Sequence, residues 1–299
     1  MHDRSHLLTE QRLHESMSLD TMNIDDAVAL MNAQDALVVA AVAAERANIA
    51  RAIELVVVAL RAGGRLLYFG AGTSGRLGIL DASECPPTFH TDPQMVQGVI
   101  AGGEAAMFKS QEGAEDKSED GGAAADAKNL GPTDIAMGIA AGGTTPFVHG
   151  ALGRARQRAA KTIFLCCVQP TADEPLVDVI IRPLTGPEVV TGSTRLKAGT
   201  ATKLVLNTIS TLAMVQLGKV HENLMVDLRA TNQKLHDRAT RIVMMLTGLA
   251  RQQSIDLLQQ AQGHLKIAVL MHRRGIEFDA ATQLLNRCDG RLRQALDSV

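Results

Sequence analysis

The chain has 299 residues, of which 46% are hydrophobic, 21% are charged and only seven are aromatic, namely six Phe and one Tyr. So few rings cannot supply the stacking surfaces on which single-stranded nucleic acids are bound. With 30 basic and 32 acidic residues, the formal net charge of −2 also lacks the basic footprint of a nucleic-acid-binding domain. We therefore expect no nucleic-acid partner, and we expect any bound sugar to be held by hydrogen bonds and charge.

The N-terminal ten residues are polar, without the apolar core of a signal peptide. The most apolar stretch, residues 36–60, is interrupted by four charged side chains, Glu45, Arg46, Arg51 and Glu54. This pattern predicts a cytoplasmic protein with no membrane association. The four cysteines form no CxxC pair and the histidines show no paired metal spacing, so neither a disulfide framework nor a metal site is expected.

Helical periodicity begins at Ile24, and residues 35–60 contain neither Gly nor Pro, which predicts an N-terminal helical segment. Short apolar strands then alternate with segments of helix length. The predicted strands are residues 65–69, 96–100, 135–140, 162–168 and 177–182. Continuous apolar strands alternating with helices predict an α/β fold, with a parallel sheet covered on both faces.

The remainder of the chain is predicted to be helical. The predicted helices are residues 194–217 and 235–249, followed from residue 254 by three short amphipathic segments separated at Gly263 and Gly275. The acidic stretch of residues 111–120 is the densest charge cluster, and its composition is typical of a solvated helix face. We expect a compact C-terminal helical subdomain.

A loop rich in glycine and hydroxyl groups, from Gly70 to Arg76, follows the first predicted strand and opens a helix. In that geometry the backbone N–H groups and the helix dipole receive a phosphate. No Lys follows the last Gly and Arg76 breaks the dinucleotide spacing, so a phosphorylated small molecule is favoured over a nucleotide. An ordinary strand-to-helix turn is the alternative.

Two further polar loops are predicted. Residues 141–146 follow a later strand, and residues 192–197 precede the long helix. Open α/β sheets bind ligands at the C-terminal ends of their strands, so we expect the three loops to converge on one crevice.

Five sequence runs carry a more specific signal, namely residues 70–89, 100–104, 112–116, 186–207 and 223–227. Together they resemble the bacterial N-acetylmuramic acid 6-phosphate etherases, a family of the sugar isomerase (SIS) superfamily. The block DASECPP at residues 81–87 is far more specific than a generic SIS glycine loop. The resemblance implies a three-layer SIS fold with a five-stranded parallel sheet flanked by helices, and a homodimer. We place the N-terminal arm and helices at 1–55, the SIS domain at 56–219 and the C-terminal helical region at 220–299.

The resemblance also implies a reaction in cell-wall sugar recycling, in which N-acetylmuramic acid 6-phosphate and water give N-acetylglucosamine 6-phosphate and D-lactate. In the open-chain sugar, the C1 aldehyde acidifies the C2 proton and permits elimination of the C3 lactyl group, so one base and one acid are needed. By resemblance, Glu84 protonates the lactyl oxygen and Glu115 removes the C2 proton. The aldehyde is itself the electron sink, so no cofactor is expected. Without the family match, both carboxylates are better explained as solvated side chains.

Further substrate-binding positions follow from the same resemblance. They are Gly72, Thr73, Ser74, Gly75, Arg76, Gly143, Thr144, Thr145, Glu188, Ser193, Thr194 and Lys197. The family usually carries Ser and Arg where this chain has Gly142 and Thr144, so one hydroxyl and one cation are missing. In the N-terminal arm, Leu13-His14 replaces the usual Asn-Pro.

Two alternatives remain open at this level. A phosphosugar aldose–ketose isomerase would share the fold and the C2 proton abstraction, although residues 81–87 and 112–116 follow the etherase pattern. A noncatalytic phosphosugar-sensing SIS protein would bind the same ligand class, although the presence of both Glu84 and Glu115 argues against loss of catalysis.

Overall fold

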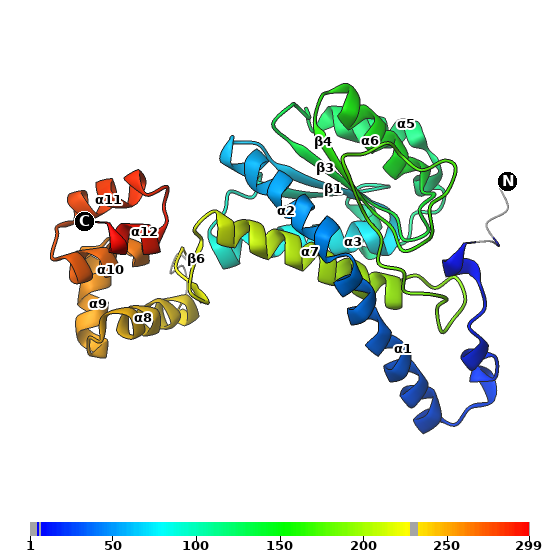
Figure 1. The fold of residues 1–299 in the computed structure, drawn as a ribbon, viewed down its shortest axis with the longest axis horizontal. Helices are drawn as coiled ribbons and strands as arrows, with labels where there is room; N and C mark the ends of the chain where they lie inside the picture. Colours follow the sequence, from blue (N-terminus) through cyan, green and yellow to red (C-terminus); the bar gives the residue numbers. More distant parts are fainter. Residues whose placement is uncertain (1–4, 6, 228–232, 299) are drawn as a thin grey trace. The chain divides into compact units, whose positions relative to one another are not determined.

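The computed structural model describes residues 5, 7–227 and 233–298 (Figure 1). The chain divides into two compact units. The first, here called the sheet unit, comprises residues 1–83 and 94–210, and the second, the helical unit, comprises residues 84–93 and 211–299. The division falls inside two long helices, between Ser83 and Glu84 and between Ser210 and Thr211.

The sheet unit is built on five parallel strands in the order β2-β1-β3-β4-β5. They are β1 (Leu66–Gly70), β2 (Val96–Ile100), β3 (Ile135–Ile139), β4 (Lys161–Leu165) and β5 (Val179–Ile181). The predicted five-stranded parallel sheet is therefore confirmed. Gly70 at the end of β1 pairs with Ile100 of β2 and with Ile139 of β3, so the loops after these strands begin side by side. The chain leaves β1 toward neighbours on both sides, which is the switch point where open sheets bind ligands.

Helices cover both faces of the sheet, which gives the three layers expected from the sequence (Figure 1). α5 (Ser118–Ala127) and α6 (Pro146–Gln157) lie on one face, and α2 (Arg46–Arg61), α3 (Gly72–Phe89) and α7 (Lys197–Gln216) lie on the other. The smaller elements of this unit are η1 (Leu8–Glu10), η2 (His14–Ser16), η3 (Leu19–Thr21), α4 (Ala105–Phe108) and η4 (Ala114–Asp116).

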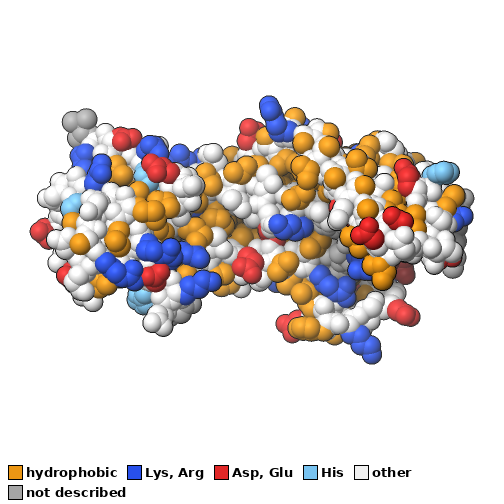
Figure 2. Space-filling view, turned by 90° about the horizontal axis from the view of Figure 1, so that it is seen from below, with side chains coloured by type: hydrophobic (Ala, Val, Ile, Leu, Met, Phe, Trp, Pro, Cys, Tyr) orange, Lys and Arg blue, Asp and Glu red, His pale blue; other side chains and the backbone are white. Residues whose placement is uncertain are grey.

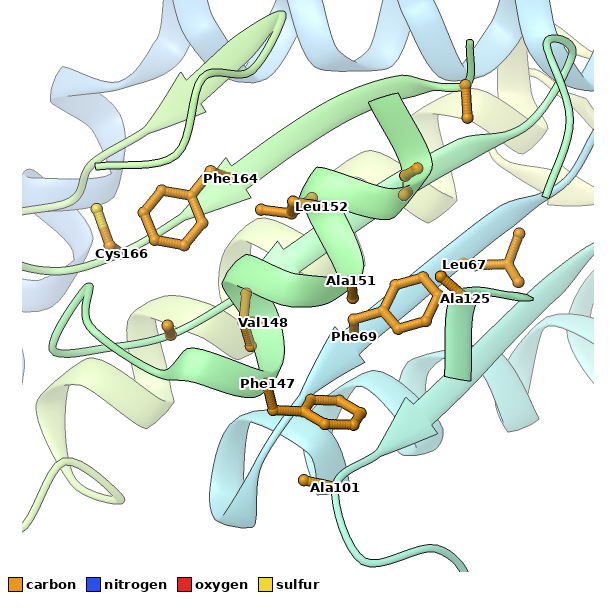
Figure 3. Packing of buried hydrophobic residues seen from close by; sticks show 14 of the residues in the cluster. Leu67, Phe69, Ala101, Ala125, Phe147, Val148, Ala151, Leu152, Phe164 and Cys166 are labelled. Atoms are coloured by element: carbon orange, nitrogen blue, oxygen red, sulfur yellow. The ribbon is translucent and has the colours of Figure 1, made fainter. Parts of the chain in front are cut away.

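The core beneath α6 combines large rings with very small residues. Phe69 of β1 and Phe164 of β4 are fully buried against Val148 and Leu152 of α6 (Figure 3). A Cβ at Gly138 of β3 would lie 2.6 Å from both of these α6 side chains, so only glycine lets the helix approach. The abundance of small residues thus serves close packing of helices on strands.

An ion pair joins the N-terminal ends of β1 and β3, at the edge of the sheet opposite the ligand loops. Asp134 accepts hydrogen bonds from the Arg65 backbone N–H at 2.9 Å, from Nε at 3.1 Å and from Nη2 at 2.7 Å. Burial acts to raise the pKa of Asp134, but the hydrogen bonds from Arg65 and from the Gly131 N–H outweigh it and lower that pKa.

The N-terminal helical segment is divided into α1 (Ile24–Ala44) and α2, because Glu45 takes φ −87° and ψ 11°. Residues 35–60 therefore do not form one continuous helix, and no Gly or Pro marks the break. By length and composition α1 also meets the criteria of a membrane span, with a mean hydropathy of 1.7 and 11% of that window buried. Val38 is nevertheless fully buried within the sheet unit.

The helical unit contains a short antiparallel pair, β6 (Val220–His221) and β7 (Leu224–Met225), followed by a cluster of helices. These are α8 (Gln233–Thr247), α9 (Arg251–Gln260), α10 (Leu265–Arg274), α11 (Phe278–Arg287) and α12 (Leu292–Asp297). The sequence predicted three short helical segments from residue 254 onward, whereas the structure has four helices, α9 to α12, the first of which begins at Arg251. The unexpected break lies at Asp289 and Gly290, which take φ values of 50° and 72°.

Candidate active site

The predicted first loop, Gly70 to Arg76, consists of the last residue of β1, Ala71 and the first residues of α3, because the helix begins at Gly72, earlier than the sequence indicated. The backbones approach closely there. A Cβ at Gly70 would lie 2.7 Å from the backbone nitrogen of Gly75, so glycine is required there. The first helical turn contains Gly72, Thr73 and Ser74, whose backbone N–H groups have no partner within the helix. The predicted strand-to-helix geometry is therefore present, and phosphate binding by these groups stays a prediction.

The third loop lies against the first. A Cβ at Gly199, in the opening turn of α7, would lie 3.6 Å from Cγ2 of Thr73 and 3.4 Å from the carbonyl oxygen of Thr194. Thr73 on the first turn of α3 therefore lies close to Gly199 on the first turn of α7. Ser193 and Thr194 form a tight turn, in which their backbone N–H groups donate to Val190 and Gly192.

The second loop follows β3 and ends at α6. Gly143 takes φ +76°, and its N–H donates to the Ala140 carbonyl at 2.8 Å. His149 Nε2 lies 2.8 Å from the Gly143 carbonyl oxygen, which ties this loop to α6. Thr144 and Thr145 are partly exposed beside it, as expected of residues available to a ligand.

Glu188 and Lys197 hold the start of α7. The Glu188 carboxylate accepts the N–H groups of Lys197 and Ala198, each at 2.9 Å, so it caps the helix. The Lys197 ammonium donates to Oε1 of Gln34 on α1 at 2.7 Å. The two side chains are 0% and 1% exposed, and burial raises the pKa of Glu188 and lowers that of Lys197. The substrate contacts that the resemblance implies for Glu188 and Lys197 stay predictions. In the structure, the hydrogen bonds of these two side chains fix the third loop.

Glu115 lines a pocket of about 270 Å³ beside the first loop. The lining residues are Ala71, Gly72, Arg76, Ala101, Ala106, Ser110, Gln111, Glu112, Gly113, Ala114 and Glu115. Arg76 donates from Nη2 to the Ala106 carbonyl at 2.8 Å and from Nε to the Met107 carbonyl at 3.0 Å. Its guanidinium thus fixes the segment that leads to Glu115, in addition to the substrate contact predicted for it.

Ser110, Gln111 and Glu112 belong to this pocket but were not among the sequence-predicted site residues. The available signal was the charge density of residues 111–120, which composition favoured as a solvated helix face. Only residues from Ser118 onward form that helix, α5, and the preceding residues form the wall of the pocket.

Glu84 lies near the end of α3 and belongs to the helical unit, whereas Glu115 belongs to the sheet unit. The side chain of Glu84 is exposed. Pro86 and Pro87 follow within the helix, and because proline carries no N–H, the carbonyl groups four residues earlier lose their usual donors. The family-specific block at residues 81–87 therefore coincides with a locally weakened helical turn.

Asp81 gives that block a structural component. Its carboxylate accepts hydrogen bonds from the Tyr68 hydroxyl at 2.8 Å, from the Asn207 amide at 2.7 Å and from the Ser210 hydroxyl at 3.0 Å. These contacts join α3 to β1 and α7. Among residues 5, 7–227 and 233–298, no group of three or more His, Cys, Asp or Glu side chains is arranged to hold a metal ion.

Two domain models match the chain. The glucokinase regulatory protein N-terminal SIS domain matches residues 48–156, and the C-terminal lid domain of glucokinase regulatory protein matches residues 222–266. Among solved structures, a phosphoheptose isomerase from Neisseria gonorrhoeae is 15% identical with a TM-score of 0.45, and the match covers 64% of this chain and 98% of that chain.

Similarity to curated proteins extends over the whole chain. The N-acetylmuramic acid 6-phosphate etherase of Gloeothece citriformis is 52% identical over 299 residues, covering 100% of this chain and 98% of that protein. The protein of the same name from a Nostoc species is 52% identical over 298 residues, covering 100% and 97%.

Proposed function

The chain belongs to the N-acetylmuramic acid 6-phosphate etherases, and we propose that it cleaves the D-lactyl ether of N-acetylmuramic acid 6-phosphate. The products are N-acetylglucosamine 6-phosphate and D-lactate, and the role is recycling of peptidoglycan sugars. The observation that carries this proposal is the 52% identity to named etherases across the full chain. The sheet unit is consistent with it, because the first predicted loop opens α3 at the switch point of the sheet and lines the same pocket as Glu115.

In the proposed mechanism, the loop amides and hydroxyl groups bind the phosphate, and the sugar reacts in its open-chain form. Glu115 takes the C2 proton while the aldehyde accepts the electron pair as an enolate. Collapse of the enolate forms the C2–C3 double bond and breaks the C3–O bond, and Glu84 gives its proton to the departing lactyl oxygen. Water then adds to C3 and a proton returns to C2, so one water molecule is consumed for each lactate released.

Glu84 must be protonated to act as the acid, and Glu115 ionised to act as the base. Two variants separate these roles. Glu115→Gln is expected to lose exchange of the C2 hydrogen with deuterated water, whereas Glu84→Gln keeps that exchange and loses lactate release by about 10²-fold or more. Wild-type lactate release in Glu84→Gln would remove this residue from the acid role.

We further propose that the protein is a cytoplasmic homodimer with regions at 1–55, 56–219 and 220–299. The dimer is supported by apolar side chains on α1 that stand exposed among the described residues of the sheet unit. Ile24 is 84% exposed and Val39 is 64% exposed, with Val28 and Leu37 each more than half exposed. Hydrophobic side chains gather on the face at the right of Figure 2, the lower side of the sheet unit in Figure 1. Burying them against a second copy would stabilise the assembly.

Incubation of the purified protein with N-acetylmuramic acid 6-phosphate, without added metal or nucleotide, tests the function. The expected result is formation of D-lactate and N-acetylglucosamine 6-phosphate in equal amounts, which mass spectrometry measures. Formation of a ketose phosphate would identify an isomerase instead. Binding without conversion would identify a noncatalytic phosphosugar sensor, the other alternative left open by the sequence.

A further inference from the structure

The N-terminal segment Leu7–Glu10 is part of the sheet unit's packing. Leu7 is 4% exposed and joins the hydrophobic cluster that contains Phe69 and Phe164. Thr9 is fully buried. A segment anchored in this way holds the residue that follows it, Glu10, in a defined place.

Thr9 lies between the second and third loops of the site. Its carbonyl oxygen accepts the Gly192 N–H at 3.1 Å, and a Cβ at Gly142 would lie 3.7 Å from its Oγ1. The segment therefore contacts both loops. The sequence predicted both to bind ligand, and they lie far apart in the chain.

Glu10 stands beside the third loop with an exposed side chain. A Cβ at Gly192 would lie 3.2 Å from its Oε2, and its Oε1 accepts the Thr9 hydroxyl at 3.2 Å. Among the ion pairs of the residues that the structure describes, none involves Glu10. The carboxylate is thus oriented by Thr9 and retains acceptor capacity toward solvent.

We infer that Glu10 is a binding residue for the neutral, hydrogen-donating part of the phosphosugar, and that Thr9 is its positioning residue. An ionised carboxylate repels the phosphate and the lactyl carboxylate, so the groups that it receives are sugar hydroxyls or the acetamido N–H. This inference deepens the proposed function and rests on it for the choice of ligand. Glu10 thereby favours a sugar phosphate over a bare phosphate ion.

Calorimetry with two probes, N-acetylglucosamine 6-phosphate and inorganic phosphate, tests this role. Glu10→Gln is expected to weaken binding of the sugar phosphate by about tenfold, as for loss of one charge-assisted hydrogen bond, without weakening binding of phosphate. Thr9→Val should do the same more mildly, and Thr9→Ser, which keeps the hydroxyl, should bind both probes as the wild type does. Asp20→Asn, an exposed carboxylate further along the arm, is the matched control and should change neither affinity.

Equal affinity of Glu10→Gln and wild type for the sugar phosphate would overturn the inference, and so would a parallel loss of both probes. Because Glu10 is exposed, its variant should fold, and thermal unfolding verifies this. Wild-type lactate release is measured separately. If the wild type binds the sugar phosphate but releases no lactate, the proposed function fails while the binding comparison still decides the role of Glu10. Wild-type protein that binds phosphate but no sugar phosphate overturns the inference.

Discussion

The ammonium group of Lys197, on the first turn of α7, donates to Oε1 of Gln34 on α1 at 2.7 Å, and both side chains are buried. Two segments 163 residues apart in the chain are joined by this bond, next to the helix cap formed by Glu188. The third loop of the candidate site is consequently fixed from the N-terminal helix as well as from α7 itself.

Lys197→Met should reduce the free energy of unfolding by about 1–3 kcal/mol, because it leaves the buried Gln34 oxygen and the Glu188 carboxylate without the cation. Gln34→Leu should cost a similar amount, because a buried ammonium then loses its acceptor. The double variant should cost less than the sum of the two, since neither partner is left unpaired. Urea unfolding measures all three, and strict additivity would show that the two side chains do not interact.

Asp134→Asn should lower the free energy of unfolding by about 1.5–3 kcal/mol at pH 7, because it disrupts the paired hydrogen bonds to Arg65. The pKa of Asp134 is lowered in the folded state, so this stabilisation is complete above the ordinary aspartate pKa of 3.8 and is lost as pH falls through the lower folded value. The difference between variant and wild type should therefore shrink below pH 3.8. Asp126→Asn, which affects only surface pairs, should cost less than about 1 kcal/mol. A pH-independent difference for Asp134→Asn would contradict the assignment.

Arg76→Met should lower kcat for lactate release by about 10- to 100-fold, because displacement of a catalytic group by about 1 Å carries a cost of that order. The reason is loss of the hydrogen bonds to the Ala106 and Met107 carbonyls that lead toward Glu115. Arg158→Met, whose guanidinium pairs with Asp126 at the surface, serves as the control and should keep wild-type kcat. A wild-type kcat in Arg76→Met would show that the segment holds its shape without the guanidinium.

Gly142→Ser should be tolerated, with a change in the free energy of unfolding within about 0.5 kcal/mol. A Cβ there meets only Thr9 Oγ1, at an ordinary contact distance of 3.7 Å. The substitution places in the second loop the hydroxyl that the family resemblance implies there, and tighter phosphosugar binding is expected. Gly143→Ser is the matched comparison and should lower the free energy of unfolding by about 1 kcal/mol or more. The residue takes φ +76°, and an added Cβ would lie 3.0 Å from Cγ2 of Val168. Equal stabilities of the two variants would contradict this reading of the loop.

Much of the fold was predictable because its signals are local. The five strands are short apolar runs, most of them flanked by Gly or Pro. The bounds of β1, β2 and β3 match the predicted ones within one residue, and the predicted ends of β4 and β5 differ by up to three residues. The strand-loop-helix pattern at Gly70 likewise located the first loop. The helix break at Glu45 contains no Gly or Pro, and the helix break at Asp289 and Gly290 lies within a charged, amphipathic stretch. The sequence pattern alone therefore predicted neither helix boundary.

The contacts within the site depend on residues far apart in the chain and left weaker signals. Nothing in the sequence pairs Lys197 with Gln34, and resemblance alone suggested Lys197 as a substrate-binding position. Thr9 and Glu10 lie more than 130 residues before Gly142 in the chain, and only the folded chain brings them against Gly142 and Gly192. Tertiary packing determines such partners, and periodicity and motif spacing do not encode it.

The central claim is elimination of lactate followed by addition of water at C3 of the sugar. The most direct measurement is mass spectrometry of both products after reaction in ¹⁸O-labelled water. Label is expected in the C3 hydroxyl of N-acetylglucosamine 6-phosphate and not in the hydroxyl of D-lactate, because the ether oxygen leaves with the lactyl group. Label in the lactate hydroxyl, or no lactate from folded protein, would contradict it.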